Sequence, residues 1–170
     1  ENHIRQLHRD LLAYSEKDER HRGHYKTGSN SVAAFDTHGK QIGIVFETAT
    51  PFDTPRLMTE LVAWVNLERE PARLHPLLVI ALCIVEFLAI HPFQDGNGRL
   101  ARILTNLLLL KAGYAYMPYV SHEKLVEDNK AEYYISLRRS QVTFKTEWED
   151  IAPWLKFFLT IVLTQARRAV

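Results

Sequence analysis

Apolar residues recur every three or four positions along most of the chain, which predicts a series of amphipathic helices. We expect helices at about residues 4–12, 54–67, 75–90, 100–110, 121–137 and 148–169. Thr54 stands before Pro55, a pair that predicts an N-cap followed by proline at the first helical position. The stretch 75–90 is apolar on all sides, which is typical of a central helix packed on every face.

One region has a strand pattern instead. Val32–Phe35 precede the turn-like residues 37–40, and apolar residues alternate with smaller ones over 42–46. This predicts a β-hairpin over about residues 31–48. The sequence therefore predicts an all-α, mainly helical fold with one small hairpin, in a single domain that spans 1–170.

Composition narrows the class of protein. Apolar residues make up 46% of the chain and charged residues 24%, as in an ordinary globular protein, and the net charge of +1 predicts no nucleic-acid surface. The apolar run Leu77–Val85 is much shorter than the roughly 20 residues that span a bilayer, so we expect no membrane segment. The chain has a single cysteine, Cys83, and we expect it to be a small buried side chain. A lone cysteine cannot form an internal disulfide, so we also expect a reducing compartment. The chain starts and ends without a methionine or a polar tail, so we expect it to be a core piece of a longer protein.

The most informative segment is the stretch 91–102, HPFQDGNGRLAR. Gly96 and Gly98 bracket Asn97 where we expect a helix to begin. Glycine allows positive φ and close approach of a ligand to the backbone. Consecutive amides that lead into a helix N-terminus form a concave anion site. The spacing therefore predicts that this loop binds phosphate.

Charged side chains in the same segment complete a site for phosphate chemistry. Arg99 and Arg102 are three residues apart, so they share one helix face, and their guanidinium groups suit phosphate oxygens. Asp95 would repel a bare phosphate but suits a cation such as Mg²⁺ that bridges phosphates. His91 can accept a proton near neutral pH. Together they predict phosphoryl or nucleotidyl transfer.

Each of these residues also has a purely structural interpretation. A histidine before proline is often a helix C-cap, Asp-Gly and Asn-Gly are common turns, and helix arginines often form surface ion pairs. We favour the catalytic interpretation because the residues are contiguous and explain one another. A non-catalytic helical regulator remains the alternative from another functional class.

The segment 91–102 resembles the signature of the Fic-domain family, HPFx[D/E]GNGRxxR, at every specified position. The resemblance extends to 23–26 before the hairpin, 50–64 after it, 74–76 before the signature and 133–134 after it. It covers nearly the whole chain, from Ile4 to about Phe158. It implies the Fic fold, a helical bundle with a β-hairpin flap.

The resemblance also implies a reaction and a role for each signature residue. Fic proteins with this signature mostly transfer AMP from ATP to a Ser, Thr or Tyr hydroxyl of a target protein. By resemblance, His91 is the general base and Asp95 binds Mg²⁺, while Phe93 is a buried anchor. The implied phosphate ligands are Gly96, Asn97, Gly98, Arg99 and Arg102, with Arg102 on the γ-phosphate and the Asn97 side chain as a further contact.

The flap and one tyrosine complete the implied site. The hairpin end, Val45, Phe46, Glu47 and Thr48, corresponds to the flap that pairs with the target peptide and borders the nucleotide. Tyr133 matches a tyrosine that lines the adenine pocket, although a tyrosine at helical spacing is as often part of the core. Gln141 stands where some members have asparagine.

The chain departs from the family in its regulation. Many Fic proteins carry an inhibitory helix with the motif [S/T]xxxE[G/N], and the segment 15–20 matches it only by chance. We expect that helix to lie upstream or on an antitoxin-like partner, so this chain is active or partly released.

Transfer of another nucleotide, or removal of AMP, stays open; Gly98 argues against the kinase branch. The target and the oligomeric state, a dimer among the options, stay open, and family distribution suggests a bacterial cytoplasm.

Overall fold

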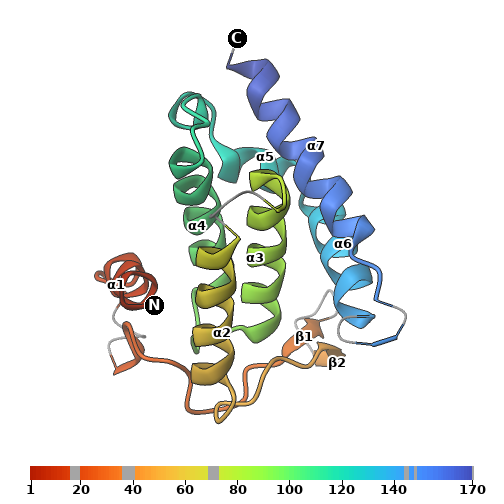
Figure 1. Cartoon of the computed structure of the whole chain (residues 1–170). Coiled ribbons are helices and arrows are strands. Elements are labelled where there is room, and N and C mark those ends of the chain that lie inside the picture. The colour runs from red at the N-terminus through yellow and green to blue at the C-terminus, as the bar shows by residue number, and fades with distance from the viewer. Residues whose placement is uncertain (16–19, 36–40, 69–72, 144–145, 148, 170) are drawn as a thin grey trace. The chain divides into compact units, whose positions relative to one another are not determined.

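The computed structural model describes residues 1–170 except 16–19, 36–40, 69–72, 144–145, 148 and 170, and for 32–45 it describes the backbone alone. The chain divides into two compact units. Unit 1 comprises residues 1–67 and 86–101, and unit 2 comprises 68–85 and 102–170. The structure of each unit is helical, as the sequence predicts (Figure 1).

Unit 1 begins with α1 (Asn2–Leu11) and also contains α2 (Thr54–Leu67). Thr54 is the first residue of α2, but it does not cap the helix, so that detail of the prediction was wrong. Its hydroxyl donates to the carbonyl oxygen of Thr50 at 2.7 Å. The Oγ1 atom of Thr50 instead accepts the backbone N–H of Asp53 at 3.1 Å. The side chain that caps the start of this helix is therefore that of Thr50, four residues before Thr54.

Two antiparallel strands lie in unit 1, β1 (Val32–Phe35) and β2 (Gln41–Phe46). Val32 lies opposite Phe46, and the register shifts after Val32 and again before Phe35. The turn that the sequence predicts at 37–40 lies outside the described residues.

Two apolar helices flank the signature loop. The first, α3 (Pro76–Ile90), starts with proline at its first position, and the Nδ1 atom of His75 accepts the N–H of Leu77 at 3.3 Å. Most of its residues from Val79 onward are buried, although Cys83 is only half-buried. The second, α4 (Asn97–Lys111), starts three residues earlier than predicted and ends before Gly113, whose φ is +92°.

Unit 2 contains a short 3₁₀ turn, η2 (Met117–Tyr119), and three helices that pack on one another: α5 (His122–Asp128), α6 (Lys130–Val142) and α7 (Ala152–Arg168). In Figure 1, α6 and α7 run side by side. The single helix predicted over 121–137 is in fact α5 and α6, because the chain breaks at Asn129. The amide of Asn129 donates to the carbonyl of Leu125 at 2.8 Å, a side-chain bond that competes with helix propagation.

Two buried side chains, those of Gln165 and Trp154, fix the C-terminal helix within unit 2 through hydrogen bonds. The amide of Gln165 donates to the carbonyl of Val120 at 2.6 Å and its oxygen lies 3.2 Å from Nδ1 of His122. The indole N–H of Trp154 donates to the carbonyl of Ala81 at 2.8 Å. In the described part of the chain, none of the helices combines the length and hydrophobicity needed to cross a membrane.

Candidate active site

The loop that joins α3 to α4 begins with a strained residue. His91 has φ of +52°, a left-handed conformation that non-glycine residues rarely adopt. Its N–H still donates to the carbonyl of Phe87 at 2.9 Å, so the last turn of α3 is complete. The following Pro92 disfavours a helical conformation at His91, which explains why α3 ends at Ile90.

The hydrogen bonds of His91 determine its tautomer. Its Nδ1 atom lies 3.2 Å from the carbonyl oxygen of Leu88. Because a carbonyl can only accept, Nδ1 must carry a proton, and in the neutral ring Nε2 then carries the lone pair. Burial lowers the pKa of His91, and the charge of Lys26 lowers it further, against the Leu88 hydrogen bond and the charge of Asp95. The imidazole is therefore a neutral base at pH 7.

The side chain of Asn97 is bonded to the loop. Its side chain is 1% exposed. Its Oδ1 accepts the N–H of Phe93 at 2.9 Å, and its Nδ2 donates to the carbonyl of Phe93 at 2.7 Å. Both polar atoms of this side chain bind the loop, and its contact with phosphate stays a prediction. Phe93 is fully buried, as the resemblance implies for an anchor.

Of the two glycines, one has the special backbone conformation. Gly96 has φ of +80°, and its carbonyl accepts the first hydrogen bond of α4, from Leu100 at 2.9 Å. Gly98 already belongs to the helix. The N–H groups of residues 97–99 therefore form the first turn of α4, where an α-helix offers them no partners of its own. This helix N-terminus is the element of the loop that could bind an anion.

His8 is a residue of the site that the sequence analysis missed. It is fully buried, and its ring stacks on Phe93 with centroids 3.8 Å apart. Its Nδ1 accepts the N–H of Gly23 at 2.9 Å, so its Nε2 carries the proton and donates to the carbonyl of Asp95 at 3.0 Å. His8 thus fixes the loop from α1. The only signal in the sequence is a histidine beside the apolar face of the first helix.

Asp95 and Arg99 form an exposed ion pair with Nη2 3.0 Å from Oδ2. The described residues contain no group of three or more potential metal-ligating side chains. A single exposed carboxylate nevertheless fits Mg²⁺, which is commonly held by one or two carboxylates together with water and substrate phosphates. Asp95 is thus the residue of this loop that could hold a cation.

A second polar network, also missed, lies behind the loop. The ammonium of Lys26 donates to Asn30 Oδ1 at 2.8 Å, to Thr48 Oγ1 at 3.0 Å and to the carbonyl of Ile90 at 2.9 Å. Thr48 therefore uses its hydroxyl within unit 1. Of the other predicted flap residues, Val45 and Phe46 belong to β2, and Glu47 is exposed after it.

In unit 2, Arg102 forms hydrogen bonds through Nε at 3.3 Å and Nη2 at 3.0 Å to the same oxygen of Glu123. Tyr133 is 7% exposed and packs edge-on against Trp154, with ring centroids 5.9 Å apart. Burial raises the pKa of Tyr133 to about 12. These contacts are those of a core tyrosine, and an adenine contact stays a prediction. Gln141 is buried in α6.

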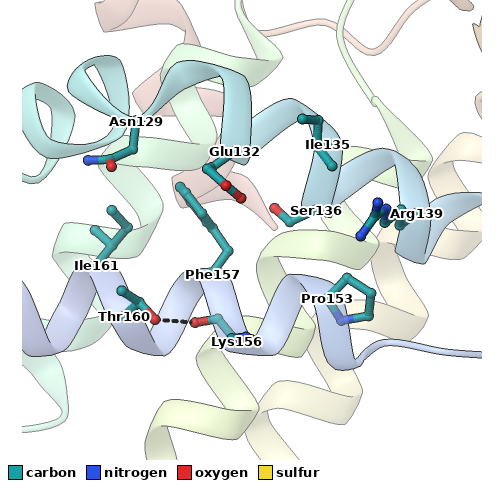
Figure 2. A pocket seen from close by; sticks show the side chains of 10 residues that line it. All are labelled: Asn129, Glu132, Ile135, Ser136, Arg139, Pro153, Lys156, Phe157, Thr160 and Ile161. Carbon is teal, nitrogen blue, oxygen red and sulfur yellow. Dashed lines mark hydrogen bonds between the residues drawn. The ribbon is translucent and has the colours of Figure 1, made fainter.

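Unit 2 also contains a pocket of about 350 Å³ between α6 and α7. Figure 2 shows Phe157 of α7 pointing toward α6, close to Glu132. None of the residues predicted for the site lines this pocket, so it has no part in the predicted chemistry. Its lining consists of Asn129, Glu132, Ile135, Ser136, Arg139, Pro153, Lys156, Phe157, Thr160 and Ile161.

Comparison with known proteins agrees with the signature. A model of the Fic/DOC family matches residues 1–109. The protein adenylyltransferase Fic of Drosophila melanogaster is 35% identical over 107 residues, which are 63% of this chain and 19% of the relative. The chain thus spans about a fifth of the length of the curated relatives it matches.

Solved structures agree as well. A Fic domain containing signaling protein from Bacteroides thetaiotaomicron has a TM-score of 0.74 and 29% identity, over 99% of this chain and 60% of that one. A Fic family protein from Desulfovibrio desulfuricans has a TM-score of 0.75 and 27% identity, over 99% of this chain and 46% of that one.

Proposed function

The chain belongs to the Fic/DOC family, whose model matches it over residues 1–109, and on that premise we propose that it is a protein adenylyltransferase. It transfers AMP from ATP to a Ser, Thr or Tyr hydroxyl of a target protein. The names of its relatives, protein adenylyltransferase Fic, support this reaction. One structural observation carries the proposal: Nδ1 of His91 contacts the carbonyl of Leu88, which leaves the lone pair on Nε2 in the loop that leads into the N-terminus of α4.

His91 acts as the general base. Its Nε2 takes the proton of the target hydroxyl while the hydroxyl oxygen attacks the α-phosphorus of ATP. A bond forms between that oxygen and the phosphorus, the bond from the α-phosphorus to the bridging oxygen breaks, and pyrophosphate leaves with the electron pair. The lowered pKa of His91, caused mainly by burial, keeps the base unprotonated at neutral pH.

The N-terminus of α4 and its arginines stabilise the phosphates. The amides of residues 97–99 and the positive end of the helix dipole favour a negative group at this place. Arg99 and Arg102 follow one turn apart on the same helix and supply guanidinium donors, with Arg102 assigned to the γ-phosphate. Asp95 would hold Mg²⁺, which neutralises phosphate charge when it is bound.

The hairpin supplies the binding site for the target. Among the described residues β2 pairs with β1 alone, so its other edge has no strand partner there. An extended segment of the target adds to the free edge of β2, near Val45–Thr48, by main-chain hydrogen bonds. The cytoplasm, where ATP is abundant, suits this reaction. An inhibitory helix, upstream or on a partner, would act at the same loop.

The test is transfer of label from ATP. The chain is incubated with labelled ATP and Mg²⁺, alone and with a cell lysate, and its intact mass is measured. We expect labelling and a mass increment of AMP, and a loss of about 10²–10⁴-fold in rate in His91→Ala, as for removal of a general base. His3→Ala is the matched control, because His3 is exposed on α1.

Three outcomes would count against the proposal. Full activity in His91→Ala would remove the general base and with it the catalytic interpretation. An increment that matches UMP or GMP, when those nucleotides replace ATP, with none from ATP, would keep the reaction type but change the donor. A chain that labels nothing with any nucleotide would favour a non-catalytic role.

A further inference from the structure

We propose that Lys26 is a positioning residue for this reaction, which couples the base of the flap to the catalytic loop through Asn30 and Thr48. The inference rests on the proposed function, since it assigns a role toward His91 as the base. It concerns unit 1 alone, because all four residues belong to that unit.

The ammonium of Lys26 is fully used. The side chain is 3% exposed, and its three N–H donors have three acceptors at 2.8, 3.0 and 2.9 Å. Those acceptors come from three places in the chain: Asn30 before the hairpin, Thr48 just after β2 and Ile90 at the end of α3. One buried cation thus joins the flap base to the helix that ends at the catalytic residue.

Asn30 passes this connection on to the loop. Its Oδ1 accepts hydrogen bonds from Lys26 and from the hydroxyl of Thr48, the latter at 2.8 Å. Its Nδ2 donates to the carbonyl of His91 at 3.0 Å and to the carbonyl of Phe93 at 2.6 Å. Both polar atoms of the Asn30 amide therefore have partners. Two of those partners, the carbonyls of His91 and Phe93, lie on the catalytic loop.

The conformation that this network holds is an unfavourable one. His91 has φ of +52°, and a strained backbone persists only where its surroundings fix it from several directions. Here the N–H of His91 donates to Phe87, its carbonyl accepts from Asn30, and the preceding carbonyl accepts from Lys26. The backbone of Lys26 also donates to the carbonyl of Pro92 at 2.8 Å. The backbone is thus bonded on both sides of His91.

The charge of Lys26 adds an electrostatic effect that a neutral packing residue would not have. Two charged groups act on the imidazole of His91: Lys26, which disfavours its protonation, and Asp95, which favours it. A buried ammonium near the end of α3 also suits the negative end of that helix dipole. Lys26 therefore holds the base in place and helps to keep it unprotonated.

The test compares Lys26→Met, which keeps the length of the side chain, with Lys156→Met, whose lysine is exposed on α7. In Lys26→Met we expect kcat to fall on the order of 10²-fold, as for a misplaced catalytic group, with KM for ATP nearly unchanged. The acidic limb of the pH profile of kcat/KM should move to higher pH, because the imidazole loses a repelling charge. Lys156→Met should behave as the wild type.

A direct NMR titration of His91 separates this inference from the proposed function. A higher pKa of His91 in folded Lys26→Met supports the inference even without an assay, and an unchanged pKa overturns it. If the wild type transfers no nucleotide, the proposed function fails instead. Should Lys26→Met not fold, Thr48→Val removes one partner and keeps the charge: kcat must fall with the pKa of His91 unchanged, and an unaltered kcat overturns the inference.

Discussion

Asn97 binds the backbone of Phe93 with both ends of its side-chain amide, at 2.9 Å to the N–H and at 2.7 Å to the carbonyl. The pair closes a five-residue loop on itself, at the point where α4 begins. The asparagine of the signature is therefore a structural clamp of the loop.

We expect Asn97→Ala to destabilise the protein by about 1–3 kcal/mol, since the N–H of Phe93 is left buried without a partner. The carbonyl of Phe93 keeps its hydrogen bond from Asn30. The measurement is urea unfolding of the two proteins. Asn106→Ala is the matched control on α4, because the Oδ1 of Asn106 has no hydrogen-bond partner among the described residues. Equal losses in both variants would contradict the clamp.

A comparable prediction concerns His8, which is distant in the sequence from the loop that it supports. His8→Phe keeps the stacking on Phe93 but leaves the N–H of Gly23 and the carbonyl of Asp95 without their partner. We expect a loss of about 1–3 kcal/mol in the free energy of unfolding, together with lower activity, because the loop loses its support from α1. His24→Phe, at an exposed position, should change neither. A stable and fully active His8→Phe protein would show that stacking alone holds the loop.

Site residues that are neighbours in the sequence could be predicted from it. Residues that are distant in the sequence and meet only in the folded protein could not. The signature at 91–102 is contiguous, so its chemistry could be predicted from the sequence alone. His8 lies 87 residues from its partner Asp95, and Asn30 lies 61 residues from His91. No helical or strand periodicity connects positions so far apart, and only the tertiary structure brings them to the loop.

The same distinction explains the boundaries of the helices. Hydrophobic spacing predicted the helices of both units but merged α5 with α6, because the break depends on the hydrogen bond from Asn129 to Leu125. Likewise the end of α3 before Pro92 could be expected locally, whereas the network around the left-handed His91 depends on Lys26, 64 residues before Ile90. Side-chain hydrogen bonds of this kind have no periodic signal.

Asp95→Asn tests the metal assignment. The ion pair with Arg99 is exposed on both sides, so its loss should change the free energy of unfolding by less than about 1 kcal/mol. Transfer from ATP should nevertheless fall strongly, because an amide is a poor ligand for Mg²⁺. The measurement is the rate against Mg²⁺ concentration, beside unfolding curves. Asp10→Asn, exposed on α1, is the control. An unchanged dependence on Mg²⁺ would place the cation on other ligands.

Glu123→Gln tests whether Glu123 competes with phosphate for Arg102. The Glu123 side chain is 66% exposed, so the ion pair contributes little, about 0–1 kcal/mol. If ATP must displace Glu123 from Arg102, the variant should have a KM for ATP lower by up to about fivefold, with stability nearly unchanged. Glu127→Gln, which breaks the pair with Lys130, is the control. A higher KM would mean that Glu123 orients the guanidinium instead.

Lys26 should make the free energy of unfolding depend on pH in the alkaline range. Burial lowers the pKa of Lys26 from 10.5 to about 8, so between these values the unfolded chain binds a proton that the folded chain has released. The free energy of unfolding should therefore rise with pH in that window. Above about pH 10 the raised pKa of Tyr133 acts in the opposite sense, since the unfolded tyrosine ionises first. Urea unfolding at pH 7.5, 8.5 and 9.5 should show the rise in the wild type and in Lys156→Met but not in Lys26→Met. Parallel curves for wild type and Lys26→Met would mean that Lys26 stays charged in the folded protein, fully compensated by Asn30, Thr48 and Ile90.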